Sequence, residues 1–478
     1  MSLPPVDLRL ILPEMIVAAG AVLVMLWGAF LPPGRQRVLR WVSAFAIILA
    51  LGVVLALQSG EPAFSFGAMH LRDALTQTLQ VIVLIVALLA VLLSGEYVER
   101  THLETGEYYA LLLSSALGAM LMAASADLLL LFLGLETLSI PLYVLAAIAR
   151  RDLRSQEAGM KYFLLGAFST TFFLYGVALI FGSAGSTNLA RVASQAGAGS
   201  PLMLAGIGLL TIGLGFKATI VPFHSWAPDV YEGAPLPVTA YMSVIAKVGA
   251  FAAIIRVFVI ALSAGAVQWG AALAALSVLT MILGNVAALL QNNLKRLLGY
   301  SSIAHAGFIL IGIVAANRAG ISAVVFYLLV YALMTLGAFG VVLMLERRGE
   351  EADEISDLAG LAGRSPLLAG AMTLFMVSLA GLPPTAGFLA KFYVFSAALD
   401  AGYPVVVIVA VVTTVVSAYF YLRVAYTMFI GQPAPEVKFA GGRWVSAALI
   451  VTSAGVLVLG IFPAPVTNFI EQMANALK

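Results

Sequence analysis

Four ionisable side chains stand deep inside long apolar runs of this sequence, where they could do chemistry. Glu136 lies in Leu-Gly-Leu-Glu-Thr-Leu-Ser-Ile-Pro, Lys217 in Gly-Leu-Gly-Phe-Lys-Ala, and Lys247 in Val-Ile-Ala-Lys-Val-Gly-Ala. Lys391 follows a double proline, in Gly-Leu-Pro-Pro-Thr-Ala-Gly-Phe-Leu-Ala-Lys-Phe. If these runs cross a bilayer, each charge costs at least about 2.5 kcal/mol at its centre, so each residue is a candidate functional site.

Proton transfer is the chemistry that these residue types favour. Burial disfavours the charged form of a lysine and a nearby carboxylate favours it again, so a lysine beside a carboxylate can hold or release a proton. Histidine suits the positions between these residues, because its unperturbed pKa of about 6.5 lets it accept and donate a proton. His224 follows Lys217 by seven residues, and His305 lies inside another apolar run. The predicted relay consists of Glu136, Lys217, Lys247, His305, His224 and Lys391.

A static role is the competing interpretation of these charges. Glu136 and one lysine could form a salt bridge that only holds two helices together. That arrangement would leave two buried lysines without a partner, which a structural role does not explain.

Other charges lie near the ends of apolar runs and are expected to be structural. Lys161, Arg256 and Arg423 are long enough to reach the headgroup region from there. Asp127 precedes an apolar run and is expected to cap its helix. Glu14 stands a few residues into the first run, and the sequence leaves open whether it anchors that helix or belongs to a proton pathway.

The elements that would position these residues are transmembrane helices. Of the 478 residues, 62% are hydrophobic and only 10% are charged, against roughly 25% charged residues in soluble domains. A span needs about 20 mostly apolar residues. The absence of cysteine excludes disulfides and thiolate metal sites within this chain. The predicted fold is an all-α integral membrane protein with about fourteen spans, at 10–31, 38–58, 75–95, 107–125, 127–149, 160–183, 201–221, 236–262, 271–290, 299–316, 321–346, 366–398, 404–430 and 444–463.

The seventh and twelfth spans share an interrupted design. Glycine and proline weaken each of them, at 213–222 and at 381–387, and each carries Gly-Phe before its lysine. Broken helices at corresponding places indicate inverted repeats, and five helices per repeat give opposite orientations. Under this alignment Glu136 corresponds to His305. The single membrane domain 1–478 then comprises helices 1–3 (1–106), repeat one with helices 4–8 (107–262), repeat two with helices 9–13 (271–430) and helix 14 (444–463).

The distribution of basic residues predicts the orientation. With both termini outside, the inner loops hold fourteen Lys and Arg residues and the outer segments hold five. Because cytoplasmic loops carry the excess of Lys and Arg, both termini are predicted on the outer side. The longest polar stretch, 346–364, then falls on the inner side and is expected to be a solvated loop.

Five motifs carry a resemblance to a known family over essentially the whole chain. The sequence resembles the antiporter-like membrane subunits of respiratory complex I. The motifs are Glu-Thr-Leu-Ser-Ile-Pro-Leu-Tyr-Val-Leu (136–145), Glu-Ala-Gly-Met-Lys-Tyr-Phe-Leu-Leu-Gly (157–166), Pro-Phe-His-Ser-Trp-Ala-Pro-Asp-Val-Tyr-Glu-Gly-Ala-Pro (222–235), Lys-Arg-Leu-Leu-Gly-Tyr-Ser-Ser-Ile-Ala-His-Ala-Gly (295–307) and Gly-Leu-Pro-Pro-Thr-Ala-Gly-Phe-Leu-Ala-Lys-Phe (381–392).

The resemblance implies a role for each deep charge. Glu136 is expected to pair with Lys217 of the first broken helix, and Lys247 to pass the proton along a central axis. Lys391 of the second broken helix is expected to release it. A lysine at 391 differs from the glutamate that subunit M of this family typically has there. The sequence is also expected to lack the long lateral helix that follows the fourteen spans of subunit L.

The same resemblance implies the setting. Members translocate protons across the bacterial inner membrane, driven by electron transfer from NADH to quinone in partner subunits. NADH, FMN, iron–sulfur clusters and quinone would be bound by those partners, and no cofactor or metal is expected in this chain. The expected neighbours are the antiporter-like subunit M and small membrane subunits such as K, within the lipid bilayer, and no nucleic acid partner is expected.

Two other functions compete with this interpretation. A subunit of a multisubunit cation/proton antiporter would carry similar buried residues, and neighbouring reading frames for quinone-reductase subunits would argue against it. A structural scaffold would use the buried charges only to hold helices together. A scaffold predicts that neutral substitutions at Lys217 or Lys247 impair assembly rather than pumping.

Overall fold

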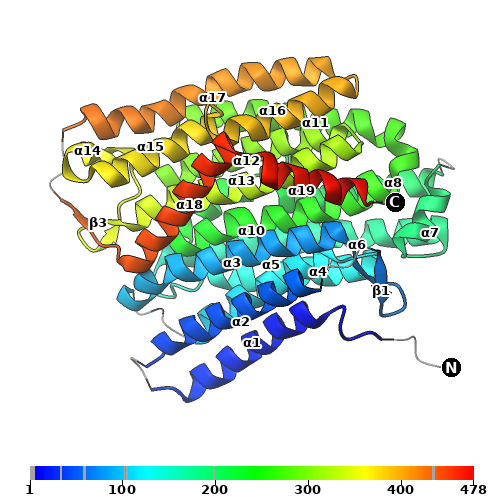
Figure 1. Cartoon of the computed structure of the whole chain (residues 1–478), viewed down its shortest axis with the longest axis horizontal. Coiled ribbons are helices and arrows are strands. Elements are labelled where there is room, and N and C mark those ends of the chain that lie inside the picture. The colour runs from blue at the N-terminus through cyan, green and yellow to red at the C-terminus, as the bar shows by residue number, and fades with distance from the viewer. Residues whose placement is uncertain are drawn as a thin grey trace.

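Long helices running side by side make up most of the chain (Figure 1). This computed structural model describes residues 6–32, 35–57, 61–101, 103, 106–197, 200–432 and 436–477. The long helices are α1 (Leu12–Phe30), α2 (Arg37–Ala56), α3 (Ala74–Arg100), α4 (Gly106–Ala123), α5 (Leu128–Ala146), α6 (Leu153–Ala184), α8 (Pro201–Ala218), α10 (Leu236–Ile254), α11 (Ala266–Leu289), α12 (Leu294–Val314), α13 (Arg318–Leu343), α15 (Pro366–Ala380), α16 (Ala386–Asp400), α17 (Pro404–Ile430) and α18 (Arg443–Ile461).

Twelve helices of the described residues are long and apolar enough to cross a membrane. Here α10 is continued by a π-helix, η1 (Ile255–Ala261), and counts with it as one span. The remaining two predicted spans are occupied by α4 and by the pair α15 and α16. The predicted all-α membrane fold is therefore confirmed. Asp127 caps α5 as expected, because its carboxylate accepts a hydrogen bond from the backbone N–H of Leu129.

Both expected helix interruptions are present. The seventh span ends its first half at α8 and resumes as the short helix α9 (Trp226–Gly233), while α15 resumes as α16. Thr219 (φ 62°) ends α8 and Gly381 (φ 81°) ends α15, both in the left-handed region. A residue with this φ cannot continue a right-handed helix, so the last carbonyl groups of α8 and α15, those of Ala218 and Ala380, have no helical N–H to accept from.

Three helices form the centre of the bundle. Almost all residues of α10, α12 and α13 are buried. In α1, α2, α6, α17 and α18, by contrast, fewer than half of the residues in the apolar stretch are buried. Figure 1 places α1 and α2 at one edge of the bundle and α17 at the opposite edge. The exposed helices present apolar side chains, as expected for the surface that faces lipid.

Short elements mark the two ends of the bundle. The hairpin β1 (Ala63–Ser65) and β2 (His70–Arg72), the first turn of α1 and the helix α7 (Leu189–Ala196) lie at one end, near α19 (Ala464–Asn475) (Figure 1). At the other end, β3 (Leu345–Arg347) pairs antiparallel with β4 (Glu350–Glu351) and with β5 (Val437–Phe439). Brief helical turns complete the described chain: η2 (Ser263–Gly265), η3 (Ile355–Leu358) and α14 (Leu361–Arg364).

The stretch 346–364 is not the solvated loop that its composition predicted. It contains β3, β4, η3 and α14. Asp357 within it is buried and accepts from Arg347 at 3.0 Å. Opposite charges inside the stretch pair with one another and with neighbouring helices, so the charge run folds onto the end of the bundle.

A buried ion pair joins the first three helices to the centre. Asp73, which precedes α3, accepts two hydrogen bonds of 2.6 Å from Arg256 in η1. The same guanidinium donates to the hydroxyl of Thr76 at 2.7 Å. Arg256 was expected to reach the headgroups, but its side chain turns inward because a carboxylate is available there, and only 2% of the residue is exposed.

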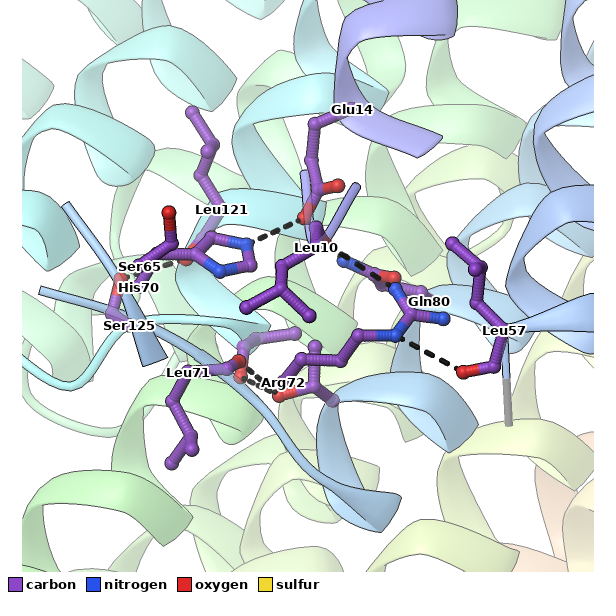
Figure 2. Close-up of polar contacts among 12 residues, drawn as sticks. Leu10, Glu14, Leu57, Ser65, His70, Leu71, Arg72, Gln80, Leu121 and Ser125 are labelled. Carbon is purple, nitrogen blue, oxygen red and sulfur yellow. Dashed lines mark hydrogen bonds and ion pairs between the residues drawn. The ribbon is translucent and has the colours of Figure 1, made fainter. Parts of the chain in front are cut away.

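A second polar cluster fixes α1 against the β1–β2 hairpin (Figure 2). The Glu14 carboxylate accepts from Gln80 of α3 at 2.6 Å and lies 3.0 Å from Nε2 of His70. Arg72 donates to the carbonyl groups of Leu57 and Leu10, and to the end of α2. These contacts hold Glu14 to α3 and to the hairpin, as an anchor of α1 requires.

The Asp73–Arg256 pair predicts a large loss of stability on substitution. Asp73→Asn leaves a buried guanidinium without its carboxylate, which costs about 3–5 kcal/mol. We expect a clearly lower apparent Tm of the purified chain. Glu436→Gln, which breaks the exposed pair with Arg348, is the control and changes stability by about 1 kcal/mol or less. Equal effects of the two substitutions would contradict the structural role of the buried pair.

Single cysteines test the orientation, because the chain has no native cysteine. Glu350 lies on β4 and Ser194 on α7, at opposite ends of the bundle, and both are exposed. In Glu350→Cys we expect labelling by a membrane-impermeant maleimide only from the inner side. In Ser194→Cys we expect labelling only from the outer side. The reversed pattern would overturn the predicted orientation.

Candidate functional site

The two helix interruptions and the central helix α10 bring the three deep lysines into the core. Lys217 lies in the last turn of α8, Lys247 in the middle of α10, and Lys391 in the second turn of α16. Each has 3% or less of its surface exposed. Among the described residues, no carboxylate lies within ion-pair distance of any of them. Their charges therefore depend on neutral oxygen atoms and aromatic rings.

Lys217 contacts tyrosines. Its Nζ donates to the hydroxyl of Tyr162 in α6 at 3.0 Å. The same Nζ lies 5.0 Å from the ring centre of Tyr162 and 5.5 Å from that of Tyr143 in α5. An ammonium group at this distance from an aromatic face is stabilised by the ring quadrupole.

The expected direct contact between Glu136 and Lys217 is not formed. Glu136 is half-buried on α5 and accepts a hydrogen bond of 2.8 Å from Thr170 of α6. Its charge still interacts electrostatically with Lys217. The predicted contact is absent because Lys217 donates to Tyr162 and the carboxylate accepts from Thr170. Nothing in the sequence distinguishes Thr170 from the other threonines of the apolar runs.

Lys247 donates to oxygen atoms from two other elements. Its Nζ lies 2.8 Å from the Ser302 carbonyl oxygen of α12 and 3.0 Å from the Thr219 hydroxyl. The carbonyl of Ala218, the last residue of α8, is 3.4 Å away. Thr219 holds a left-handed conformation that is rare for a β-branched residue, and such strain is often found at functional sites. The break after α8 thus supplies two of the three oxygen partners.

Ser302 joins Lys247 to a group of hydroxyls. Its carbonyl accepts from Lys247, and its own hydroxyl lies 2.9 Å from that of Tyr331 in α13 and 3.3 Å from that of Tyr231 in α9. Tyr331 also packs its ring against His305, with ring centres 5.3 Å apart. Hydroxyl groups both donate and accept, so this group can pass a proton between nitrogen atoms.

Each ring nitrogen of His305 contacts one tyrosine hydroxyl. Nδ1 lies 2.7 Å from the hydroxyl of Tyr327, and Nε2 lies 3.2 Å from that of Tyr421 in α17. The Tyr421 hydroxyl also contacts Ser301. A histidine with one hydroxyl on each nitrogen can exchange its donor and acceptor roles between them.

Lys391 repeats the arrangement of Lys247 at the other interruption. Its Nζ donates to the carbonyl of Ala380, the last residue of α15, at 2.9 Å. Gly381 leaves the space for it, since a Cβ there would stand 2.7 Å from the lysine Cδ. The ring of Phe308 lies 4.6 Å from Nζ. In both places an ammonium meets the carbonyl end of a helix, where the helix dipole favours positive charge.

His224 is placed apart from this group. It lies in the connection between α8 and α9 and is half-buried, with no described hydrogen bond to any of the three lysines. Its Nδ1 is buried without a partner among the described residues. The structure therefore brings four of the six predicted residues, Lys217, Lys247, His305 and Lys391, into the core. Glu136 is half-buried on α5, and His224 lies at the margin.

The hydroxyl groups are what the sequence analysis missed. Tyrosine, serine and threonine are common in apolar helices, so their types alone did not stand out. The available signal was their place inside the quoted motifs, which contain Tyr143, Tyr162, Tyr231, Ser301 and Ser302.

Comparison with known proteins places this site in a family. Residues 125–417 match the family model for NADH:quinone oxidoreductase and Mrp antiporter transmembrane proteins. The chain is 43% identical to NADH-quinone oxidoreductase subunit N of Chloroflexus aggregans, over 99% of this chain and 98% of the relative. It is 44% identical to subunit N of Trichlorobacter lovleyi, again over 99% and 98%.

A solved structure agrees with these relatives. In respiratory complex I from Thermus thermophilus with bound aureothin, one chain is 39% identical to this one. The two superpose with a TM-score of 0.82 over 95% of this chain and 98% of that chain. Interrupted helices with buried lysines in an all-helical bundle define an antiporter-like membrane subunit. The chain belongs to the NADH:quinone oxidoreductase/Mrp antiporter family, and the two relatives described above are N subunits.

Proposed function

We propose that this chain is the subunit N of a bacterial NADH:quinone oxidoreductase and translocates protons across the inner membrane. The reaction would be driven by electron transfer from NADH to quinone in partner subunits, which would hold the cofactors. The observation that carries this proposal is the surroundings of Lys247, whose Nζ is buried against three neutral oxygen atoms with no carboxylate in contact.

The physical argument rests on what happens when such a lysine loses its proton. A buried ion pair that loses one charge leaves the other uncompensated, at a cost of about 3–5 kcal/mol. Lys247 and Lys391 are held by carbonyl and hydroxyl oxygens, so deprotonation strands no opposite charge. The neutral amine keeps two N–H groups that can donate to these acceptors. A lysine in this setting can therefore cycle between two states at small structural cost.

The proposed route follows the contacts. From Lys217 the proton passes by way of the broken segment, whose Thr219 hydroxyl contacts Lys247. From Lys247, which contacts the Ser302 carbonyl, it continues to the hydrogen-bonded hydroxyls of Ser302 and Tyr331, and from there to His305, against which the Tyr331 ring packs. The last step leads from His305 to Lys391, with Phe308 lying between their helices. Internal water would complete the gaps between hydrogen-bonding groups. We assign His224 no step in this route, because it forms no described hydrogen bond with any of the three lysines.

The position of Glu136 supports a partner subunit on this side. Glu136 is only half-buried although α5 spans the membrane, and Ile140 beside it is exposed. A carboxylate is too costly to leave in contact with lipid at this depth. A neighbouring membrane subunit that covers the α5–α6 surface would remove that contact. The small membrane subunits such as K and the antiporter-like subunit M are the partners we propose for the chain's surfaces.

The two halves of the site support the proposed division into inverted repeats. In each half an ammonium group meets the last carbonyl of an interrupted helix, Ala218 in one and Ala380 in the other. We assign repeat one to 107–262 and repeat two to 271–430, with 1–106 and 444–463 outside them. Both termini would face the periplasm.

A subunit of a multisubunit cation/proton antiporter is the second candidate, because the matching family model covers both kinds of complex. Identity above 40% to N subunits along the whole chain favours the oxidoreductase. Neighbouring reading frames decide between them: genes for quinone-reductase subunits would support the first candidate, and genes for antiporter subunits the second.

Lys247→Arg tests the relay at its centre. Guanidinium keeps the positive charge but does not release its proton. We expect an assembled complex whose proton pumping in reconstituted vesicles falls at least about tenfold, as for loss of an acid–base group. Lys161→Arg is the control, since Lys161 lies half-exposed between Glu157 and Asp229, and should pump normally. Wild-type pumping by Lys247→Arg would exclude lysine deprotonation from the cycle.

Glu136→Gln tests the electrostatic action of Glu136 on Lys217. Removing the carboxylate charge removes an electrostatic attraction that favours the protonated lysine. We expect reduced NADH-driven pumping in an assembled complex, with a smaller loss in Glu136→Asp. Glu107→Gln, which neutralises an exposed carboxylate at the start of α4, should have no such effect. Normal pumping by Glu136→Gln would mean that Lys217 does not need this charge.

A further inference from the structure

A fourth buried lysine lies at the end of the bundle that carries β3 and β4. Lys295 is the second residue of α12, and only 2% of it is exposed. Its Nζ donates to a carboxylate oxygen of Glu351 and to the carbonyl of Ala234, both at 2.7 Å. The relay described above does not use this lysine, and by the distribution of basic residues it faces the inner side.

Glu351 connects this lysine to the inner solution. Its side chain is 21% exposed, against 3% for that of Lys295. Its other carboxylate oxygen accepts from the Tyr97 hydroxyl at 2.7 Å and from the backbone N–H of Leu236 at 2.8 Å. Leu236 is the first residue of α10, so the carboxylate sits at the positive end of the helix that carries Lys247. The ion pair therefore has one member in contact with the inner solution, Glu351, and one buried member, Lys295.

Lys295, the buried member of the pair, lies in the first turn of α12, the helix that also carries Ser302 of the relay. Ser302 is seven residues beyond Lys295, which is two turns and about 10 Å along the helix. Tyr231 lies beside this part of α12, packed against Gly299, and its hydroxyl contacts that of Ser302. The carbonyl of Ser302 accepts the hydrogen bond from Lys247. Lys295, Tyr231 and Ser302 thus form a polar line from the inner end to the central lysine.

We propose that Glu351 and Lys295 take up protons from the inner solution and deliver them through Tyr231 and Ser302 to Lys247. In each passage Lys295 gives one proton towards Tyr231 while Glu351 takes one from the inner solution, so that neither charge of the pair is left alone. The Glu351 carboxyl group then returns its proton to Lys295. Water would bridge two steps: from Lys295 to the Tyr231 hydroxyl, and from the Ser302 hydroxyl to Lys247, whose own hydrogen bond is to the Ser302 carbonyl. This assignment rests on the proton translocation proposed above and gives that route an entrance.

Few other ionisable groups face Glu351. From α3 it meets Tyr97, and from α12 it meets Lys295. Glu346 lies opposite it across the β3–β4 pair and is itself paired with Arg100 of α3. The N-terminal turn of α10 contributes a backbone N–H and no ionisable side chain.

A static clamp is the alternative, in which the pair only fastens β4 to α10 and α12. The two assignments differ for Lys295→Arg, which keeps the positive charge and the contact with Glu351 but cannot release a proton. They also differ in pH dependence. When uptake is impaired, a falling proton concentration on the inner side limits the rate, whereas a weakened clamp acts equally at every pH.

The experiment compares Glu351→Gln, Glu351→Asp and Lys295→Arg in the complete complex, reconstituted in vesicles with a controlled inner-side pH. Assembly is checked on native gels. We expect Lys295→Arg and Glu351→Gln to pump about threefold or more slowly at a pH of about 8 on the inner side, with the defect shrinking towards pH 6, because proton uptake becomes limiting when donors are dilute. Glu351→Asp should recover part of the rate. Glu350→Gln, the exposed neighbour on the same strand, should match wild type throughout.

Each outcome has one meaning. If Lys295→Arg pumps like wild type at both pH values, Lys295 does not cycle its proton and the inference fails, even where Glu351→Gln does not assemble. A defect of equal size at both pH values identifies a clamp. If Lys247→Arg is blocked while Lys295→Arg and Glu351→Gln are normal, the entrance lies elsewhere and the relay stands. If Lys247→Arg pumps normally, the proposed function itself fails.

Discussion

The hydrogen bonds from Lys247 and Lys391 to the last carbonyl groups of α8 and α15 are the contacts around which this bundle is organised. A helix that ends inside a membrane leaves carbonyl groups unpaired, and an ammonium group at the same depth lacks solvation. The hydrogen bond between them satisfies the carbonyl group and solvates the ammonium group. The interruption provides oxygen atoms and the negative end of a helix dipole, and the lysine provides the donor.

This exchange explains where the interrupted helices must lie. Irregular backbone is tolerated at membrane depth only when protein or a water-filled space surrounds it. Accordingly the most buried helices pack against the interruptions: α10 and α12 against the first, and α12 and α13 against the second. Small residues permit the close approach: a Cβ on Gly387 would stand 1.8 Å from the carbonyl oxygen of Ser378, so α16 folds back tightly against α15. The continuous outer helices supply the apolar surface.

The helices and the deep charges could be predicted because both are visible in the order of residue types along the chain. Apolar runs of sufficient length predict spans, and charges inside them are conspicuous. Prediction from the sequence failed where partners come from far along the chain. Nothing local indicated that Arg256 would turn inward to Asp73, or that Thr170 would hold Glu136 in place of Lys217. The folding of 346–364 onto the bundle was missed for the same reason, since its charges are neutralised by residues such as Arg100 and Lys295 that lie elsewhere in the sequence.

The ion pair of Asp73 and Arg256 has a consequence for the order of biosynthesis. The two residues are 183 positions apart, so Asp73 enters the membrane long before its arginine has been translated. Its place directly before α3, at the boundary of a span, lets the carboxylate remain hydrated during that interval. When η1 arrives, the pair closes and the first three helices become fixed to the centre. A nascent chain halted before residue 256 would therefore carry α1 to α3 as a loosely attached unit, open to quality-control proteases.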